Sequence, residues 1–375
     1  MIYLDNAATT APDKNALDLA AKFNDSTFFN PSALYRGGIE NAKEIKNAKS
    51  EILRFLGVNA DDYDVVFTSC GTESDNLAIF GAVSRGVFIT DKGEHAAVYN
   101  SFRELSLKGQ KVYFCDLNPD GSINTDNLFE TVKNFGADFV SVMHVNNETG
   151  AINDVNYIAD NLKKINPRII FHSDGVQAFG KIPFNLGKNI DLYSISAHKI
   201  NALKGTGALI KRKKINIKPL IIGGGQENGL RSGTENLFGI KVFEYAAKKH
   251  YKTIKTDFEK ISGIKKYFIE NIDKELFTII SESGSPYVLM LAVKNLRGET
   301  LMHCLEEKGV IVGNGSACSS KSKVNRVLSA CGVKPTIADG AVRISFSYEN
   351  TMEDAINAVY IINETAAGLK RVMLK

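Results

Sequence analysis

Cysteine is scarce in this 375-residue chain, and its placement argues against two kinds of scaffold. There are five cysteines, which is an odd number, and they are widely separated without a C-x-x-C pair. Disulfide frameworks usually come from an even set, and structural zinc sites from closely spaced pairs. The cysteine content therefore favours neither, and it suits a reducing compartment, for which we expect the cytoplasm.

Long apolar runs and strong charge are also missing. No apolar stretch approaches the roughly 20 residues needed to cross a bilayer, and no segment resembles a signal peptide. The net charge of +4 requires neither a nucleic-acid groove nor an acidic partner. The six histidines occur singly, so we expect no metal site. Repeats and low-complexity linkers are absent as well.

The remaining signal is a regular alternation of strands and helices in a chain that is 44% apolar. Continuous apolar runs followed by segments of helical period are typical of a mostly parallel sheet with helices on both faces. Beyond about residue 251 the elements form a smaller set. We therefore expect an α/β fold with a large domain over residues 14–250, and a smaller α+β domain formed by residues 1–13 and 251–375.

Two neighbouring strands end in complementary chemical groups. The strand at residues 168–172 runs into Asp174, and the strand at residues 192–196 runs into His198 and Lys199. Open α/β sheets bind ligands at this carboxyl edge. Pyridoxal phosphate needs an amine for a Schiff base and an anion opposite its pyridine nitrogen, so that the ring acts as an electron sink. A solvated side chain is the simpler interpretation of Lys199 alone, but with Asp174 it fits the two ends of this cofactor.

Other strand ends carry polar groups that the same cofactor could use. A buried strand at residues 64–68 runs into a Gly-Thr turn, before a helix expected at residues 74–83. The free N–H groups and the dipole of such a helix N-terminus favour a phosphate. Each polar group alone is an ordinary loop residue, but five consecutive strand ends with suitable groups favour a binding site. The further residues of this kind are His95, Asn147 and Gln177.

Two candidates for substrate chemistry lie in the second half of the chain. Cys318 stands in a run of small polar residues, and Lys321 and Lys323 follow it with charges that would favour a thiolate. The alternative is a small buried side chain, which is the commoner fate of a cysteine. Arg343 is isolated in the apolar strand at residues 340–345. It pairs with a carboxylate either of the protein or of a substrate.

These motifs, in this order, resemble those of the cysteine desulfurases, a class V group of fold-type I pyridoxal-phosphate enzymes. The resemblance covers nearly the whole chain. The matching runs include Tyr3-Leu-Asp-Asn-Ala-Ala-Thr-Thr10, Phe67-Thr-Ser-Cys-Gly-Thr-Glu-Ser-Asp-Asn76, Met143-His-Val-Asn-Asn-Glu-Thr-Gly150, His172-Ser-Asp174 with Gln177, Ser196-Ala-His-Lys199, Arg231-Ser-Gly-Thr234, Gly315-Ser-Ala-Cys318 and Val342-Arg343-Ile-Ser345.

The resemblance implies a role for each cofactor residue. Lys199 would bind the cofactor covalently and move the substrate's α-proton. Asp174 would pair with the pyridine nitrogen, His95 would stack on the ring as a catalytic residue, and Gln177 would hydrogen-bond the phenolic oxygen. The phosphate would be held by Gly71, Thr72, Ser196 and His198, with Thr234 reaching in from the partner subunit of a homodimer.

The resemblance also implies a substrate and a reaction. Arg343 and Asn147 would bind the carboxylate of L-cysteine, with Asn147 also at the cofactor. Cys318 would take the sulfur as a persulfide, leaving L-alanine, and pass it to a sulfur-acceptor protein. A selenocysteine lyase or another class V enzyme is the alternative within the family. A non-catalytic sulfur-relay or scaffold partner is the alternative outside enzymes.

Three departures from the family pattern leave the acceptor open. Asn201-Ala-Leu stands where the family usually has Tyr-Gly-Pro, and the Cys318 run lacks the Glu-Pro stretch of the housekeeping members. The chain ends at Lys375 without the long tail that those members use to dock an iron–sulfur scaffold. Iron–sulfur assembly and tRNA thiolation are both expected candidates for the role.

Overall fold

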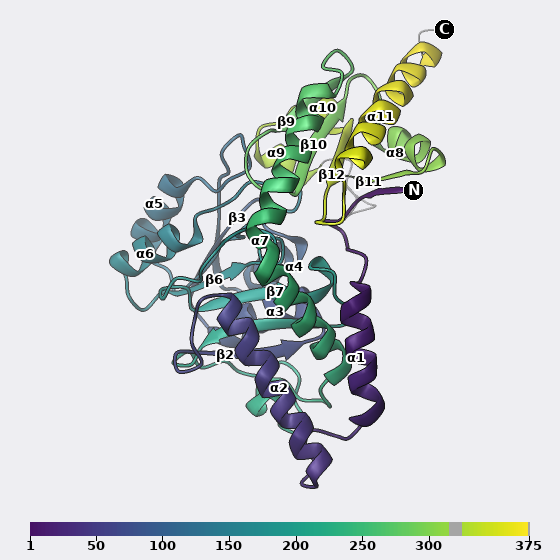
Figure 1. Cartoon of the computed structure of the whole chain (residues 1–375). Coiled ribbons are helices and arrows are strands. Elements are labelled where there is room, and N and C mark those ends of the chain that lie inside the picture. Colours follow the sequence, from purple (N-terminus) through teal and green to yellow (C-terminus); the bar gives the residue numbers. More distant parts are fainter. Residues whose placement is uncertain (315–324, 374–375) are drawn as a thin grey trace.

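Two β-sheets organise the chain in the computed structural model, which describes residues 1–314 and 325–373 (Figure 1). The larger sheet has seven strands, and all neighbours are parallel except β8, which is antiparallel to both β2 and β7. The expected mostly parallel α/β sheet is confirmed. In spatial order its strands are β2 (Tyr63–Thr68), β8 (Gly207–Arg212), β7 (Leu192–Ser196), β6 (Ile170–Asp174), β5 (Phe139–Ser141), β3 (Val87–Asp91) and β4 (Lys111–Cys115).

Helices cover both faces of this sheet. Several begin where an Asp or Asn side chain accepts a hydrogen bond from the first turn, as Asp13, Asn124 and Asp154 do. The helices are α1 (Lys14–Ser26), α2 (Arg36–Phe55), α3 (Gly71–Ala82), α4 (Ala96–Leu107), α5 (Thr125–Phe135) and α6 (Val155–Ile165). Helix α6 was not predicted from the sequence, and α3 begins at Gly71, three residues before the predicted start at residue 74.

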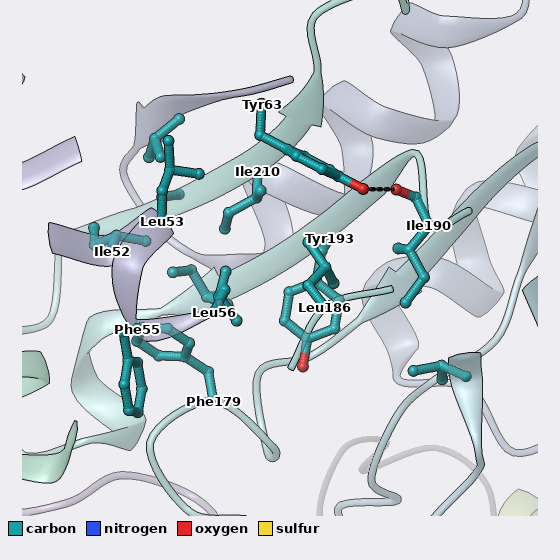
Figure 2. Packing of buried hydrophobic residues seen from close by; sticks show 14 of the residues in the cluster. Ile52, Leu53, Phe55, Leu56, Tyr63, Phe179, Leu186, Ile190, Tyr193 and Ile210 are labelled. Atoms are coloured by element: carbon teal, nitrogen blue, oxygen red, sulfur yellow. Dashed lines mark hydrogen bonds between the residues drawn. The ribbon is translucent and has the colours of Figure 1, made fainter. Parts of the chain in front are cut away.

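Alternation along the strands divides the large core into two layers. In β7, Leu192 joins the cluster on one face, whereas Tyr193 and Ile195 join the cluster on the other. Figure 2 shows the second cluster, in which Phe55 of α2 meets Phe179 edge to face at 4.8 Å. These apolar layers hold the strands in register and so position the residues at the strand ends.

The smaller sheet has five strands and its own core. β1 is parallel to β11, and the remaining neighbours are antiparallel. Its strands, in spatial order, are β1 (Ile2–Leu4), β11 (Val310–Asn314), β12 (Ala341–Ser345), β10 (Val288–Val293) and β9 (Phe277–Ser281). The helices of this half are α8 (Gly298–Glu307), α9 (Arg326–Ala330), α10 (Pro335–Ala338) and α11 (Met352–Met373).

One long helix, α7 (Leu237–Asn271), runs along both halves (Figure 1). Phe243 packs into the core of the large sheet, whereas Ile264 and Phe268 pack into the core of the small one. The expected boundary at residue 250 therefore falls inside a continuous helix. The division into domains at that residue stays a prediction. In the part of the chain that the structure describes, no helix has the length and apolar content to cross a membrane.

The N-terminal segment links the two sheets. The N–H of Ala7 donates to Ser345 Oγ of β12 at 2.9 Å, and the N–H of Thr10 donates to the carbonyl of His198 at 3.0 Å. Residues 5–10 thus cross from the small sheet to the carboxyl end of β7 in the large one.

Candidate active site

A cavity of about 450 Å³ lies where the carboxyl ends of the large sheet face the small sheet. Most of the residues singled out from the sequence line it. They are Gly71, Thr72, His95, Asn147, Asp174, Gln177, Ser196, His198, Lys199 and Arg343. Thr234 is not among its lining residues, and Cys318 lies outside the described residues.

Lys199 closes the one-turn helix η1 (Ala197–Lys199) that follows β7. Its Nζ donates hydrogen bonds to the carbonyls of Ala7 and Ala8, at 2.6 and 2.7 Å. The N-terminal segment thereby holds the amine at the cavity wall. Sequence reasoning did not anticipate this contact, because nothing in the local pattern shows that the two segments meet.

Asp174, the last residue of β6, is a buried carboxyl group that accepts a hydrogen bond from the N–H of Val176 at 2.9 Å. Burial raises its pKa to about 6, against the lowering effects of that hydrogen bond and of the Lys199 charge. Asp75 of α3 is buried beside it. Burial, and then the charge of Asp174, raise the pKa of Asp75 well above its usual value. Two adjacent buried carboxyl groups favour a positively charged group or a proton between them.

A metal ion is the alternative ligand for the carboxyl groups of Asp75 and Asp174. Asp75, His95 and Asp174 bring one ligand atom each to within 4.8 Å of one another. Burial, and then the charges of Lys199, Arg326 and Arg343, lower the pKa of His95 to about 4. The same positive charges oppose a divalent cation. His95 Nδ1 also accepts a hydrogen bond from the N–H of Ala97 at 3.1 Å, which engages one of its two ring nitrogens.

The cavity residues at the start of α3 and the end of β7 have the chemistry of an anion site. α3 begins at Gly71, and its N-cap Cys70 makes no side-chain capping bond. Ser196 Oγ is buried, and no hydrogen-bond partner lies near it among the described residues. A Cβ on Gly71 would lie 2.8 Å from Val176 Cγ2, so only glycine leaves room for a ligand beside Ser196. Helix N–H groups and an unpaired hydroxyl suit a phosphate.

His198 lies in η1, two residues after Ser196, and it also lines the cavity. Its Nδ1 lies 3.1 Å from Thr9 Oγ1. Burial lowers its pKa to about 4, and the charge of Lys199 acts in the same direction. The ring is therefore neutral near pH 7 and can donate or accept a hydrogen bond without adding a charge.

Arg343 projects from β12 of the small sheet into the same cavity. Its Nη2 donates to Asp5 Oδ1 at 2.8 Å, and its Nη1 donates to the carbonyl of Asn147 at 3.0 Å. Its Nε is buried, and no partner for it occurs within the described ranges. Both interpretations of this arginine from the sequence stay open, because it pairs with a protein carboxylate and still faces the cavity.

The described residues that flank Cys318 also belong to this region. Asn314 lines the cavity. Asn325 donates through Nδ2 to Glu148 Oε2 at 2.6 Å, and Glu148 lines the cavity as well. Asn314 therefore lies at the cavity, and Asn325 contacts a residue that lines it.

Thr234 lines a second, smaller cavity of about 130 Å³ with Arg231 and Gly233. Arg231 Nε lies 2.9 Å from Glu73 Oε1, which ties this glycine-rich loop to α3. Thr234 itself is exposed. Within a single chain it does not contribute to the large cavity.

The chain is similar to known proteins over nearly its whole length. The family model "Aminotransferase class-V" matches residues 2–357. A cysteine desulfurase of Nostoc sp. strain PCC 7120 is 34% identical over 384 residues, covering 99% of this chain and 94% of the relative. The solved structure of a NifS-like protein is similar with a TM-score of 0.90 at 33% identity, over 98% of this chain and 99% of that one. The structure of SspA in complex with cysteine has a TM-score of 0.78 at 29% identity, over 92% and 99%.

Proposed function

Because the chain belongs to the class-V aminotransferase family, we propose that it is a pyridoxal-phosphate-dependent cysteine desulfurase. It takes sulfur from L-cysteine and leaves L-alanine and a persulfide on Cys318. The observation that supports this most directly is the lining of one cavity by an amine, a buried carboxyl group and a guanidinium, from Lys199, Asp174 and Arg343.

The cavity residues fit this cofactor at both of its ends. When bound, pyridoxal phosphate supplies the electron sink that makes cleavage of the substrate's Cβ–Sγ bond feasible. Asp174 would face its ring nitrogen, His95 its ring, and Gln177 its phenolic oxygen. The unpaired Ser196 Oγ and the open N-terminus of α3 would hold its phosphate.

Other polar side chains of the cavity transfer the proton and bind the substrate. Lys199 moves the α-proton of the substrate, since its Nζ is the amine at the cavity wall. Arg343 and Asn147 bind the substrate carboxylate, which must compete with Asp5 for the guanidinium. Arginine suits this task because its planar fork binds carboxylates in a bidentate manner.

Cys318 accepts the sulfur as a thiolate that attacks the substrate's sulfur atom. It is four positions beyond Asn314 in the sequence, and an extended chain of that length spans at most about 14 Å. Its place in the sequence between Asn314 and Asn325 supports its access to the cavity. The persulfide then passes to a sulfur-acceptor protein. A reducing cytoplasm, which the cysteine content favours, keeps such a thiol available.

We further propose that the working unit is a homodimer. Large apolar side chains remain exposed in this chain: Leu34 is 92%, Ile222 86% and Phe28 77% exposed. Leu220, Ile221 and Ile222 are three consecutive exposed apolar residues, and such a group, unlike a single exposed side chain, is typical of a protein contact. Ile222 stands in the same glycine-rich loop as Thr234, so pairing there would carry Thr234 toward the partner's phosphate site.

The deciding experiment follows the sulfur atom. The purified protein, loaded with pyridoxal phosphate, is exposed briefly to L-cysteine, and its peptides are analysed by mass spectrometry. We expect one added sulfur on the peptide with Cys318, together with alanine release. Cys318→Ala should lose both, whereas Cys70→Ala should at most weaken cofactor binding. Added sulfur on Cys70 or Cys331 would reassign the nucleophile.

Two further measurements separate the alternatives. A non-catalytic relay or scaffold protein would retain no visible absorbance band after the cofactor is added and the unbound cofactor is removed. Parallel assays with cysteine and selenocysteine compare the desulfurase with a selenocysteine lyase, for which Cys318→Ala is informative. Retained turnover of selenocysteine alone in that variant would favour the lyase.

A further inference from the structure

Lys181 is a buried lysine just outside the large cavity. It is only 4% exposed, and it follows the turn that begins at Gly175 after β6. Its Nζ donates to Gln177 Oε1 at 2.8 Å. Across residues 1–314 and 325–373, no carboxylate lies within ion-pair distance of it. Burying an ammonium group without a counter-ion is costly, so a purely structural role explains this residue poorly.

The groups that surround Lys181 increase this cost. Burial lowers its pKa to about 7, and the charges of Lys199 and Arg343 act in the same direction. His250 of α7 is close enough for the charge of Lys181 to lower the pKa of the imidazole, and His198 is affected in the same way. All these neighbours are basic, so the hydrogen bond to Gln177 is the favourable polar contact that the lysine makes.

This hydrogen bond, together with one to the Ala7 carbonyl, fixes which way the Gln177 amide faces. The Ala7 carbonyl on the other side can only accept, and a lysine nitrogen carries N–H donors whether charged or neutral, so the amide oxygen is the atom that faces Lys181. The amide nitrogen then donates to the carbonyl of Ala7 at 2.8 Å. The same carbonyl accepts from Lys199 Nζ at 2.6 Å. Gln177 lines the cavity, and its NH₂ group has a second hydrogen for a ligand there.

We propose that Lys181 is a positioning residue: by donating to Gln177 Oε1, it presents an amide N–H, rather than a carbonyl oxygen, to the anionic ring oxygen of the bound cofactor. This inference rests on the proposed function, because it needs pyridoxal phosphate in the cavity. Without the lysine, the buried Gln177 oxygen loses its donor, and the amide can turn its oxygen toward the cavity. An acceptor facing an anionic oxygen disfavours the ionised form.

The test is a pH titration of the visible absorbance of the cofactor-loaded protein. Lys181→Met removes the donor and keeps a similar chain length. We expect the midpoint of the spectral change to move upward by about one pH unit, a tenfold change in proton affinity, since a hydrogen-bond donor to the ionised form is lost. An unchanged midpoint in a folded, cofactor-loaded variant would overturn the proposal.

A double-mutant cycle shows whether the lysine acts through Gln177. In the Gln177→Ala background, Lys181→Met should leave the midpoint nearly unmoved; a full shift there contradicts the proposal. Gln177→Ala alone should raise the midpoint, and no effect would refute the inference even if Lys181→Met does not fold.

Lys265 is the matched control. It is also a buried lysine, it donates to the carbonyls of Ser283 and Ser285 at 3.1 Å, and it is not a lining residue of the cavity. Lys265→Met should lower the unfolding temperature and leave the spectral midpoint in place. If the wild-type protein shows no cofactor-dependent band, the proposed function itself fails. If the wild type titrates and Lys181→Met titrates identically, only the role of Lys181 fails.

Discussion

Arg343 and Asp5 form an ion pair in the cavity wall, with Arg343 Nη2 lying 2.8 Å from Asp5 Oδ1. The arginine belongs to β12 and the aspartate follows β1, so the pair joins the two ends of the sequence. Their side chains are only 10% and 21% exposed. Because the guanidinium already has a carboxylate partner, a substrate carboxylate must bind by sharing or displacing it.

The first prediction concerns Arg343→Lys. Lysine keeps the charge but loses the planar fork, so we expect KM for cysteine to rise about 10- to 100-fold, or roughly 1.4–2.8 kcal/mol. The absorbance of the bound cofactor should not change. Steady-state kinetics test this, with Arg54→Lys at the exposed ion pair with Glu51 as the control. A loss confined to kcat would assign Arg343 a different role.

Lys199→Ala is the second prediction. The variant should still bind the cofactor through Asp174 and through Ser196 and the start of α3, yet turn over no cysteine, because the amine that lies against Ala7 and Ala8 is removed. Borohydride reduction followed by mass spectrometry should attach the cofactor to the wild type and not to the variant. Sulfide release by the variant would mean that another base moves the proton.

The third prediction compares two glycines. Gly71→Ala places a Cβ 2.8 Å from Val176 Cγ2 and 3.4 Å from Ser196 Cβ, so we expect a loss of about 1–3 kcal/mol in the free energy of unfolding. Cofactor affinity should fall about tenfold, because less room is left for the phosphate between Gly71 and Ser196. Gly263→Ala in α7 meets no atom within 4 Å, and it should stabilise the protein by about 0.4–1 kcal/mol. Equal effects of the two changes would argue against a crowded corner.

The fourth prediction concerns the pH dependence of stability. His144 is buried, its Nδ1 lies 2.8 Å from Tyr193 OH, and burial lowers its pKa to about 3. The unfolded chain binds this proton below about pH 6.5, whereas the folded chain does not until about pH 3. Unfolding therefore takes up a proton between these values, and this group makes stability rise with pH there by up to about 1.4 kcal/mol per unit.

His144→Asn keeps a polar atom near the Nδ1 position and removes the titration. Urea unfolding of the variant between pH 4 and pH 6.5 should therefore show a shallower rise than the wild type. Parallel curves for the two proteins would mean that His144 is protonated in the folded state.

Subunit association is the subject of the fifth prediction. Ile222→Asp changes a side chain that is 86% exposed in the single chain, so it should cost little stability in a monomer. In the proposed homodimer it should weaken association and reduce desulfurase activity together. Light scattering measures the first effect. Leu107→Asp, 79% exposed on α4, is the control and should leave the mass unchanged. An active monomer at the assay concentration would remove Thr234 from the site.

The local sequence pattern by itself determined the type of sheet and the place of the candidate site. Apolar runs with helical segments between them predicted the mostly parallel sheet, because each run has to be buried on both faces. Polar residues placed after those runs predicted where a site would lie, since parallel strands end at a common edge. His95, Asp174 and Lys199 lie at or after the carboxyl ends of three different strands and line one cavity for that reason. The roles assigned to them stay predictions.

Contacts between segments far apart in the sequence decided the partners of the polar residues at the site and the direction of β8. Asp5 meets Arg343 across 338 residues, and Ala7 receives Lys199 across 192 residues. Asp75 and Lys181 look like ordinary polar residues in the sequence, and only the packing of α3 and of the turn after β6 buries them beside the site. The antiparallel direction of β8 depends likewise on its pairing with both β2 and β7. The local sequence pattern predicts which apolar residues are buried. The partner of a buried polar group, in contrast, depends on how the helices and strands pack.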